Sequence, residues 1–537
     1  MQSISLETAQ SGAWDILIIG TGMGGGFLGR RLAEAGLSVL FLEKGPIGHS
    51  SEQVVRFDGV DPQARQMRGK WPKPAEFRKD GKEGTRFFGP YGSGVGGSSV
   101  FYAGALERPE RHDIDDDPTI PHPTGGWPVS FDTYQPYFEA ARRLLKISGE
   151  LDPLTPDPDP GLLAPLPVPS GDQAIMDEMK RRGLNPYRLH LAFSKPDCRQ
   201  CIGHKCPWGC KMDSRSAGVI PALATGRAAL LAECNVTEIL DDGQTVTGVK
   251  VICEGQEAVL KAGQYSLSGG ALGSARLMLA SKGTNPGGCA NSSDWVGRGL
   301  MFHLDEYFML WPRMKNRGET PEFGKTISSR DLYRDGDQRY GLVQSVGIDA
   351  SYGNLVMYLN QLFDQSVFRH FGRLKAFLRF PALILSQLFG NATVMTAMME
   401  DFAYPENRVL LSDEHPDILT FQYSYKPELL ARRKKFRRLM RKKFRGHRRF
   451  MVSLQPVLNF GHPLGTLRFG SDPKTSVLRP DCRTHDLDNL YVVDGSFMPS
   501  AMGVNPSLMI AANALRVADI IASSAKEEAK DAALQHV

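Results

Sequence analysis

Apolar and small residues near the N-terminus occur in the order expected for a strand, a glycine turn and a helix. An apolar run extends over Trp14–Ile19, and residues 27–35 carry apolar side chains at helical spacing. Three glycines separate the two segments: Gly20, Gly22 and Gly25. A second apolar run, Ser38–Leu42, ends at Glu43. This pattern predicts a βαβ unit of a parallel sheet.

The three glycines and Glu43 predict a site for a dinucleotide. Gly20 permits a tight turn, Gly22 lets a pyrophosphate approach the backbone, and Gly25 lets the helix pack on the strand. A carboxylate at the end of the second strand can bind ribose hydroxyls. A glycine-rich turn without a ligand is the alternative, and the flanking strand, helix and Glu43 favour the dinucleotide site. The pattern alone does not separate FAD from NAD.

Later segments combine small residues with buried strands in the same way. A second glycine-rich loop covers residues 92–104, where the backbone can lie against a flat or charged group, and an ordinary surface loop is the alternative. A turn and helix at 269–279 follow a predicted hairpin at 246–265. Three C-terminal motifs follow in order: His462-Pro-Leu-Gly-Thr466, a buried strand ending at Asp494-Gly495, and Asn505-Pro506 before a helix.

The intervening segments lack the pattern of dinucleotide-binding units. Residues 408–412 and 419–425 are predicted to be strands. Residues 429–450 place their apolar side chains near helical spacing among many bases, which predicts an amphipathic helix. Its basic face is either exposed to solvent or bound to another surface. That surface would be a membrane with anionic lipid or an acidic partner. The apolar stretch 376–389 slightly favours such a contact, and could equally line an entrance for an apolar substrate.

Positive charge is concentrated in that basic segment. The 537 residues include 64 Lys and Arg and 59 Asp and Glu, which gives a formal net charge of +5. Residues 432–449 alone contain twelve Lys or Arg and no acid, so the remaining 52 bases (64 − 12) are fewer than the 59 acids. A single basic patch does not predict a nucleic-acid-binding surface, and no nucleic-acid partner is expected.

The sequence predicts a cytoplasmic protein. The N-terminal residues lack the basic, apolar and small-residue regions of a secretory signal. The stretch 376–389 is too short to span a bilayer and is interrupted by Arg379 and Pro381. In a reducing compartment, the eight cysteines are expected to be thiols, metal ligands or a redox centre rather than structural disulfides.

Half of the cysteines lie in a short insert, residues 198–211. They have the spacing C-x2-C-x4-C-x3-C: Cys198, Cys201, Cys206 and Cys210. Four such thiolates can hold a zinc ion or an iron–sulfur cluster, and free or disulfide-linked thiols are the third alternative. The spacing does not name the metal. The other four are scattered and expected to be structural thiols: Cys234, Cys253, Cys289 and Cys482.

The glycine and C-terminal motifs, and the order in which they occur, resemble those of the glucose–methanol–choline (GMC) oxidoreductases. These are FAD flavoproteins that mostly oxidise alcohols. The resemblance extends from Asp15 to about Asp519. The resemblance implies an α/β fold in which a Rossmann-like FAD-binding domain is interleaved with an α+β substrate-binding domain. The implied segments are 1–106, 196–307 and 450–537 for FAD, and 107–195 and 308–449 for the substrate. The chain departs from the family pattern at Phe101-Tyr102, where an Asn is usual, and at Ala275, where a Pro is common.

The resemblance also implies which residues hold FAD and perform catalysis. Those at FAD are Gly20, Gly22, Gly25, Glu43, Gly96, Gly97, Ser98, Ser99, Val236, Asp494, Gly495 and Pro506. Within this set, Glu43 would bind the adenosine ribose and Val236 the adenine. His462 matches the active-site histidine and Asn505 the second member of the catalytic pair. Histidine suits removal of the hydroxyl proton, while an amide can hold the substrate oxygen as a hydride passes to flavin N5.

The implied activity is oxidation of an alcohol to a carbonyl. The variant at residues 100–104 resembles that of bacterial relatives that oxidise hydroxyls on sugars or aminocyclitol natural products. The electron acceptor would be O2 for an oxidase or an external redox partner for a dehydrogenase, and an iron–sulfur cluster at the cysteine insert would favour the dehydrogenase. Two alternatives are an FAD-containing lyase of the same fold and a non-catalytic flavin- or metal-binding partner.

Overall fold

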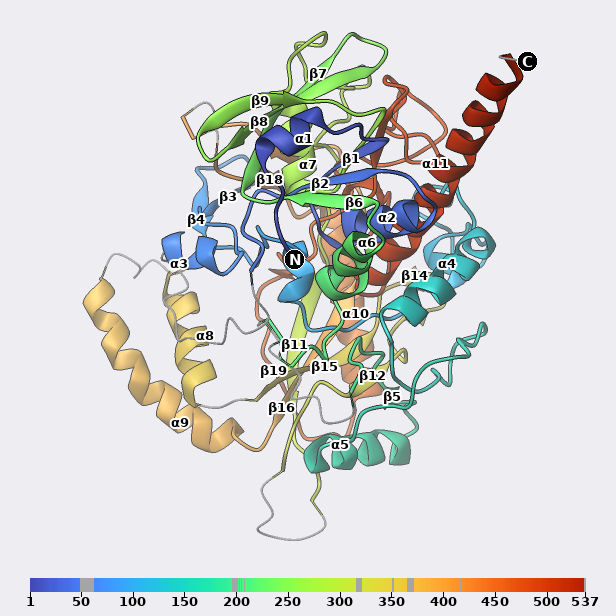
Figure 1. The fold of residues 1–537 in the computed structure, drawn as a ribbon. Coiled ribbons are helices and arrows are strands. Elements are labelled where there is room, and N and C mark those ends of the chain that lie inside the picture. The colour runs from blue at the N-terminus through green and yellow to red at the C-terminus, as the bar shows by residue number, and fades with distance from the viewer. Residues whose placement is uncertain are drawn as a thin grey trace.

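Two large β-sheets organise the chain, with helices packed around them (Figure 1). The computed structural model describes residues 1–48, 62–195, 201, 203, 205, 206, 208–314, 321–349, 352–364, 371–412, 414, 415 and 417–535. Its helices are α1 Leu6–Ser11, α2 Met23–Glu34, α3 Pro62–Met67, α4 Phe131–Leu144, α5 Ser170–Arg181, α6 Ile220–Ala224, α7 Gly270–Ala280, α8 Tyr352–Asp364, α9 Arg379–Phe389, α10 Pro427–Lys443 and α11 Ser507–Gln535.

The first sheet is parallel, with the strand order β21-β10-β1-β2-β6. Its strands are β1 Ile16–Ile19, β2 Val39–Leu42, β6 Ala228–Leu231, β10 Gln264–Leu267 and β21 Leu490–Val492. The predicted βαβ unit is confirmed as β1, α2 and β2. Because β2 lies on one side of β1 and β10 on the other, the strand order reverses at β1. In such sheets the ligand crevice lies beyond the carboxyl ends of the strands at that point.

Helices α2, α4 and α11 pack together beside this sheet. Among the described residues, one helical segment, Ser507–Glu527 of α11, is long and apolar enough to cross a membrane, with a mean hydropathy of 1.4. However, 67% of the apolar window is buried inside the protein. A helix buried in a protein core is apolar for the same reason as a membrane span, and the contacts with α2 and α4 account for its composition.

The second sheet is antiparallel and lies below the first in the view of Figure 1. It has the order β19-β11-β16-β15-β12-β5, and β20 also pairs with β11. Its strands are β5 Tyr187–Arg188, β11 Leu304–Leu310, β12 Ile327–Ser329, β15 Val343–Asp349, β16 Thr393–Met399, β19 Arg449–Met451 and β20 Val457–Leu458. The predicted domain boundary at 307–308 therefore falls inside β11.

Three smaller sheets complete the strands. They comprise β3 Ala75–Lys79, β4 Thr85–Phe87, β17 Arg408–Leu410 and β18 Thr420–Tyr423; β7 Cys234–Asp241, β8 Val246–Cys253 and β9 Gln256–Leu260; and β13 Arg334–Asp335 with β14 Gln338–Arg339. The strands predicted at 408–412 and 419–425 are confirmed as β17 and β18. The hairpin predicted at 246–265 is confirmed as β8 and β9, after which β10 enters the parallel sheet.

The basic segment forms a shorter helix than predicted. Helix α10 ends at Lys443, and residues 449–451 form β19 instead of continuing the helix. Its apolar face is buried as predicted through Leu429, Phe436, Leu439 and Met440. Three of its arginines point inward rather than to solvent: Arg432 pairs with Glu428, and Arg433 and Arg437 pair with Glu306. Part of the positive charge is thus neutralised by the protein itself.

The expectation that Cys234 and Cys253 are thiols is wrong. The two residues face each other on the neighbouring antiparallel strands β7 and β8, with a Cα–Cα distance of 4.3 Å, and form a disulfide. Cross-strand pairing brings together side chains that the sequence separates by 19 residues. Cys289 and Cys482 are buried thiols, as expected.

Candidate active site

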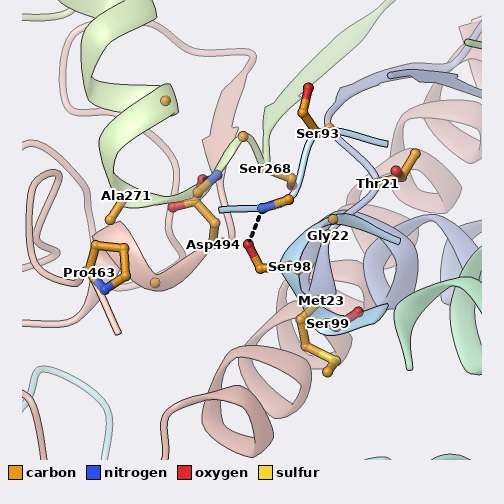
Figure 2. A pocket seen from close by; sticks show the side chains of 18 of the residues that line it. Thr21, Gly22, Met23, Ser93, Ser98, Ser99, Ser268, Ala271, Pro463 and Asp494 are labelled. Atoms are coloured by element: carbon orange, nitrogen blue, oxygen red, sulfur yellow. Dashed lines mark hydrogen bonds between the residues drawn. The ribbon is translucent and has the colours of Figure 1, made fainter. Parts of the chain in front are cut away.

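A cavity of about 490 Å³ opens where β1, β2 and β10 end, at Ile19, Leu42 and Leu267. Its volume lies within the usual range for small-molecule and cofactor sites. Figure 2 shows side chains from distant parts of the chain around it, including Thr21, Ser98, Ser268 and Asp494. The crevice predicted by the strand order is thus present as a cavity.

The first glycine turn brings the N-terminus of α2 to the cavity. Gly20 has φ +98°, a conformation that side chains with a Cβ rarely adopt. A Cβ on Gly25 would lie 2.1 Å from the Gly20 carbonyl oxygen, so helix and strand can pack this closely only with glycine there. Gly22 precedes the helix without a side-chain cap. The first N–H groups of α2 therefore remain suited to bind a phosphate.

Glu43 joins the two glycine loops through Thr21. Its Oε2 accepts hydrogen bonds from the Thr21 backbone N–H at 3.1 Å and from Thr21 Oγ1 at 2.5 Å, and its Oε1 accepts one from Gly45 N–H at 3.1 Å. Thr21 Oγ1 in turn accepts a hydrogen bond from Gly96 N–H at 3.0 Å. The carboxylate predicted to bind ribose thus also positions both loops, and lines the cavity.

The second glycine loop is fixed by serines. Gly92 N–H donates to Ser98 Oγ at 2.9 Å, the bond drawn in Figure 2. Ser99 Oγ donates to Gly96 O at 2.6 Å and accepts from Ser214 N–H at 3.0 Å. Ser214 Oγ lies 2.8 Å from the carbonyl oxygens of Thr21 and Gly22. Ser214 therefore connects the two loops from a segment that the sequence analysis did not single out.

Asp494 holds the start of α7 against the end of the parallel sheet. Its Oδ2 accepts hydrogen bonds from Gly270 N–H at 2.9 Å and Ser274 Oγ at 2.5 Å. Its Oδ1 accepts from the backbone N–H of Ser496 at 2.9 Å and also from the Ser496 hydroxyl. Burial raises the pKa of this carboxyl, and the four donors oppose that rise. Asp494 and Gly495 both line the cavity.

The cavity brings together most of the predicted site residues. Those that line it are Gly20, Gly22, Glu43, Gly97, Ser98, Ser99, Val236, His462, Asp494, Gly495, Asn505 and Pro506. Gly25 and Gly96 do not line it. A Cβ would lie 2.1 Å from Gly20 O at Gly25 and 2.5 Å from the Val100 side chain at Gly96, so both glycines permit close packing.

Several buried polar atoms of lining residues fit a bound dinucleotide. Ser268 Oγ, Asn505 Oδ1 and Trp71 Nε1 have no hydrogen-bond partner among the described residues. Buried polar groups without partners are rare, and a ligand in the cavity would satisfy them. Together with the uncapped N-terminus of α2, these atoms fit a dinucleotide such as FAD.

His462 contacts a second histidine that the sequence analysis missed. Its Nδ1 lies 3.1 Å from Nδ1 of His303, and Nε2 of His303 lies 3.1 Å from the carbonyl oxygen of Met502. A carbonyl only accepts, so neutral His303 carries its proton on Nε2 and offers Nδ1 as an acceptor. His462 must then donate from Nδ1, which leaves its Nε2 unprotonated. His462 lines the cavity, whereas His303 is fully buried.

The surroundings keep both imidazoles neutral. Burial lowers the pKa of His462 well below its usual value, and the neighbouring His303 and Lys325 lower it further. Burial likewise lowers the pKa of His303 to about 4. Near Lys325, burial raises the pKa of Asp305 to about 7, although Tyr307 and Asn459 donate hydrogen bonds to its Oδ2. A neutral His462 can accept a proton, as a general base must.

His303 could not have been found from spacing alone. It precedes His462 by 159 residues and lies directly before β11. The available signal was a histidine directly before an apolar strand, which is equally typical of a structural residue. The two histidines meet because β20 pairs with β11 just before residue 462, and Asn459 N–H donates to His303 O at 2.9 Å.

The cysteine insert reaches the cavity, because its Gly203 is one of the lining residues. Cys198 is outside the described residues. Cys206 and Cys210 are buried with their Sγ atoms 3.4 Å apart, and Cys201 is partly exposed. Within the part of the chain that the structure describes, no group of three or more metal-binding side chains gathers. Lys211 Nζ donates to the carbonyl oxygen of the cavity-lining Tyr102 at 3.2 Å and to that of Cys201 at 2.8 Å, so the insert is connected to the cavity wall.

Fold and cavity together define a dinucleotide-binding protein, and comparisons with known proteins specify the family. The GMC oxidoreductase family matches at residues 15–305 and 403–514. The chain is 28% identical over 95% of its length to 6'''-hydroxyparomomycin C oxidase of Streptomyces lividus, covering 91% of that protein. It is 25% identical over 96% of its length to the fructose dehydrogenase large subunit of Gluconobacter japonicus, covering 98% of it.

A solved structure shows the same fold. A formate oxidase variant from Aspergillus oryzae, studied for its FAD modification, superposes with a TM-score of 0.64 at 16% identity, over 96% of this chain and 99% of the other. The chain therefore belongs to the GMC oxidoreductase family. It is an FAD-dependent enzyme that oxidises alcohol CH–OH groups, as the sequence resemblance predicted.

Proposed function

We propose that this enzyme oxidises a hydroxyl of a sugar, cyclitol or other natural product, with His462 as the base and Asn505 as the group that holds the substrate oxygen. The observation that carries the proposal is the hydrogen bond between His462 and His303. It leaves Nε2 of His462 without a proton, on a side chain that lines the cavity. An alcohol oxidase or dehydrogenase needs such a base beside its cofactor.

Each of the two residues has a separate task. Nε2 of His462 takes the hydroxyl proton, and the lowered pKa ensures that it is free to do so at neutral pH. Asn505 does not titrate, and its Oδ1 has no partner among the described residues. An amide held beside the base can bind the alcohol and fix the orientation of the carbon that is oxidised. FAD, when bound, accepts the hydride from that carbon.

We propose that FAD lies along the cavity between the parallel sheet and the pair His303 and His462. Val236 would contact the adenine and Glu43 the ribose, while the N-terminus of α2 at Gly22 would bind the pyrophosphate. Gly97, Ser98 and Ser99 would lie along the flavin, and Asp494, Gly495 and Pro506 would close over it. That all of these residues line one cavity supports the proposal.

The substrate class rests on the relatives. One acts, by its name, on an aminoglycoside hydroxyl and another on fructose. Both are polyhydroxylated molecules, which supports a carbohydrate-like alcohol here. Phe101 and Tyr102 line the cavity where an Asn is usual in the family, so they are the residues expected to distinguish this substrate from those of other members.

The electron acceptor is proposed to depend on the cysteine insert. A zinc ion or iron–sulfur cluster would need Cys198 and Cys201 in addition to the close pair Cys206 and Cys210. With a cluster, electrons would leave to an external redox partner; without one, O2 is the acceptor. Iron, zinc and sulfide analysis of anaerobically purified enzyme, with its visible spectrum, distinguishes these outcomes. The domain boundaries given above and a cytoplasmic location stay predictions, to be tested by limited proteolysis and cell fractionation.

The central experiment is anaerobic reduction of the bound flavin by candidate polyols. Wild-type enzyme is expected to lose its yellow colour, and His462→Ala is expected to slow this reduction by about a thousand-fold while FAD stays bound. His415→Ala is the matched control, since that histidine lies outside the cavity. A flavin that stays oxidised in wild-type enzyme with every alcohol would favour a lyase, and equal reduction in His462→Ala would overturn the assignment of the base.

A further inference from the structure

An apolar surface projects from the body of the protein, far from the parallel sheet. It consists of Phe371, the helical turn η5 Gly372–Leu378 and α9, which together we name the apolar arm (Figure 1). Seven of its large apolar side chains are exposed: Phe371, Leu374, Phe377, Phe380, Leu383, Ile384 and Leu388. Phe377 is 64% exposed and Phe380 69%. A contiguous patch of this kind on a soluble protein marks a contact with something else.

The exposed side chains form one face of a continuous helical segment. Phe377, Phe380, Ile384 and Leu388 are spaced by three or four residues, as neighbours on a helix surface are. The opposite face packs on the protein: Ala382 is buried, and α9 contacts α8. A helix that is apolar all round is normally buried on all sides. Here the described residues cover only one of the two apolar faces.

The inner end of the arm is anchored to the antiparallel sheet. Phe389 packs against Trp311 and Phe450 with tilted rings, whose centroids are 5.7 Å and 5.3 Å away. Phe450 belongs to β19 and is itself half exposed. This contact fixes the direction in which the arm projects, so the exposed face is held open by packing within the protein.

Positive charge borders the apolar face, and acidic residues are absent from the arm. Residues 371–392 contain Arg373, Lys375 and Arg379 and no Asp or Glu. The end of the basic segment adds to this, because the Arg448 guanidinium lies 4.9 Å from the Trp311 ring that contacts Phe389. Large apolar side chains bordered by bases are the composition of helices that lie in the interface of an anionic membrane.

We propose that the apolar arm attaches the enzyme to an anionic lipid bilayer, with the exposed face of α9 inserted among the headgroups and Arg373, Lys375 and Arg379 against lipid phosphates. A second copy of the chain fits less well, since a two-fold contact would bring the basic arms of both copies together without an acidic residue of the arm to neutralise them. The attachment is peripheral and separate from the proposed chemistry, because no residue of the arm lines the cavity.

The test uses FAD-loaded enzyme in flotation with vesicles of phosphatidylcholine, with and without phosphatidylglycerol. Wild-type enzyme is expected to float with the phosphatidylglycerol vesicles. The variant Phe377→Ser/Phe380→Ser/Ile384→Ser is expected to bind about a hundred-fold more weakly, and Arg373→Gln/Arg379→Gln about ten-fold more weakly at low salt. The matched control Leu151→Ser/Leu154→Ser/Leu163→Ser replaces three exposed leucines elsewhere and should bind as wild type does.

Two results would overturn the proposal. One is the absence of vesicle binding by wild-type enzyme, or binding that the arm variants leave unchanged. The other is a wild-type dimer in light scattering that the triple arm variant converts to a monomer, which would make the arm an interface between copies. All the substituted side chains are exposed, so melting temperature and flavin reduction should equal those of wild type and verify that the variants are folded.

Discussion

His462 and His303 meet through their Nδ1 atoms, 3.1 Å apart, and only one of the two can carry a proton there. The Met502 carbonyl decides which one, because it accepts a hydrogen bond from His303 Nε2 at 3.1 Å. The protonation of the proposed base is therefore set by a backbone carbonyl three residues before Asn505 and by a buried histidine. His303 is not among the residues that line the cavity, and we propose that it acts by positioning His462.

Substitutions of His303 should show whether this residue positions His462 or only stabilises the fold. In His303→Asn, the side-chain oxygen can take the place of Nδ1 and accept from His462, whereas His303→Leu offers no acceptor. We expect the Leu variant to lose about a hundred-fold in kcat and the Asn variant about ten-fold or less. Stopped-flow flavin reduction measures both.

A purely structural role would give a different result. It would leave the pH dependence of kcat/KM in place in both variants. Because the His303 ring helps to lower the pKa of His462, its loss should instead move the acidic limb of the profile toward higher pH. Equal activity of the Leu and Asn variants would contradict the positioning role.

The pH dependence of kcat/KM in wild-type enzyme should show that burial lowers the pKa of His462. Activity needs neutral His462, so it is present above the pKa of this group and lost as the pH falls through it. Burial lowers that pKa well below the usual value near 6.5. We expect kcat/KM to remain level between about pH 8 and about pH 6 and to fall only in more acidic solution. An acidic limb centred near pH 6.5 would show that water reaches His462 freely.

The carboxylate of Asp494 should be needed both for stability and for cofactor binding. In Asp494→Asn, the amide nitrogen cannot accept the hydrogen bond from Gly270 N–H. The loss of charged, buried hydrogen bonds should lower the free energy of unfolding by about 2–3 kcal/mol and reduce FAD content. Denaturant unfolding and flavin absorbance measure the two effects. The control Asp488→Asn alters an exposed carboxylate and should change stability by less than about 0.5 kcal/mol.

Local patterns in the sequence predicted those parts of the fold that depend on neighbouring residues. The order of apolar run, glycines and helix located β1, α2 and β2, and the sequence resemblance located His462 and Asn505. His303 and Ser214 were missed because their contacts join segments 159 and about 190 residues apart, which no local spacing encodes. Side-chain position across sheets depends on strand register, and this is fixed only when the whole chain packs.

The Cys234–Cys253 disulfide is an instructive case, because a signal for it was present. Asp242 and Gly243 predict a turn, and a hairpin centred there places residues 234 and 253 opposite each other. Thiols were predicted instead because a reducing compartment was expected. Since Cys234 lines the cavity next to Val236, the disulfide lies beside the proposed adenine site.

Removing the disulfide should therefore weaken both the fold and the cofactor site. Cys253→Ser and the double variant Cys234→Ser/Cys253→Ser should each lower the free energy of unfolding by about 3 kcal/mol, the value expected for a loop of this size. The single and double losses should be equal, because either variant removes the same bond. Peptide mapping without reductant should recover the two cysteines linked. Two alkylated thiols in the native enzyme would refute the cross-link.

Substitutions of Gly22 and Gly25 should have different effects, although both residues belong to the same glycine turn. One should weaken cofactor binding and the other should destabilise the fold. A Cβ on Gly22 would have only Ser268 O nearby, at 3.7 Å, so Gly22→Ala fits the protein but fills space at the proposed pyrophosphate position. A Cβ on Gly25 would lie 2.1 Å from Gly20 O, so Gly25→Ala forces α2 away from β1. Without FAD, we expect Gly22→Ala to unfold at the wild-type temperature and Gly25→Ala well below it. On titration with FAD, Gly22→Ala should bind at least about ten-fold more weakly than wild type. Wild-type affinity in Gly22→Ala would show that the pyrophosphate does not lie against this residue.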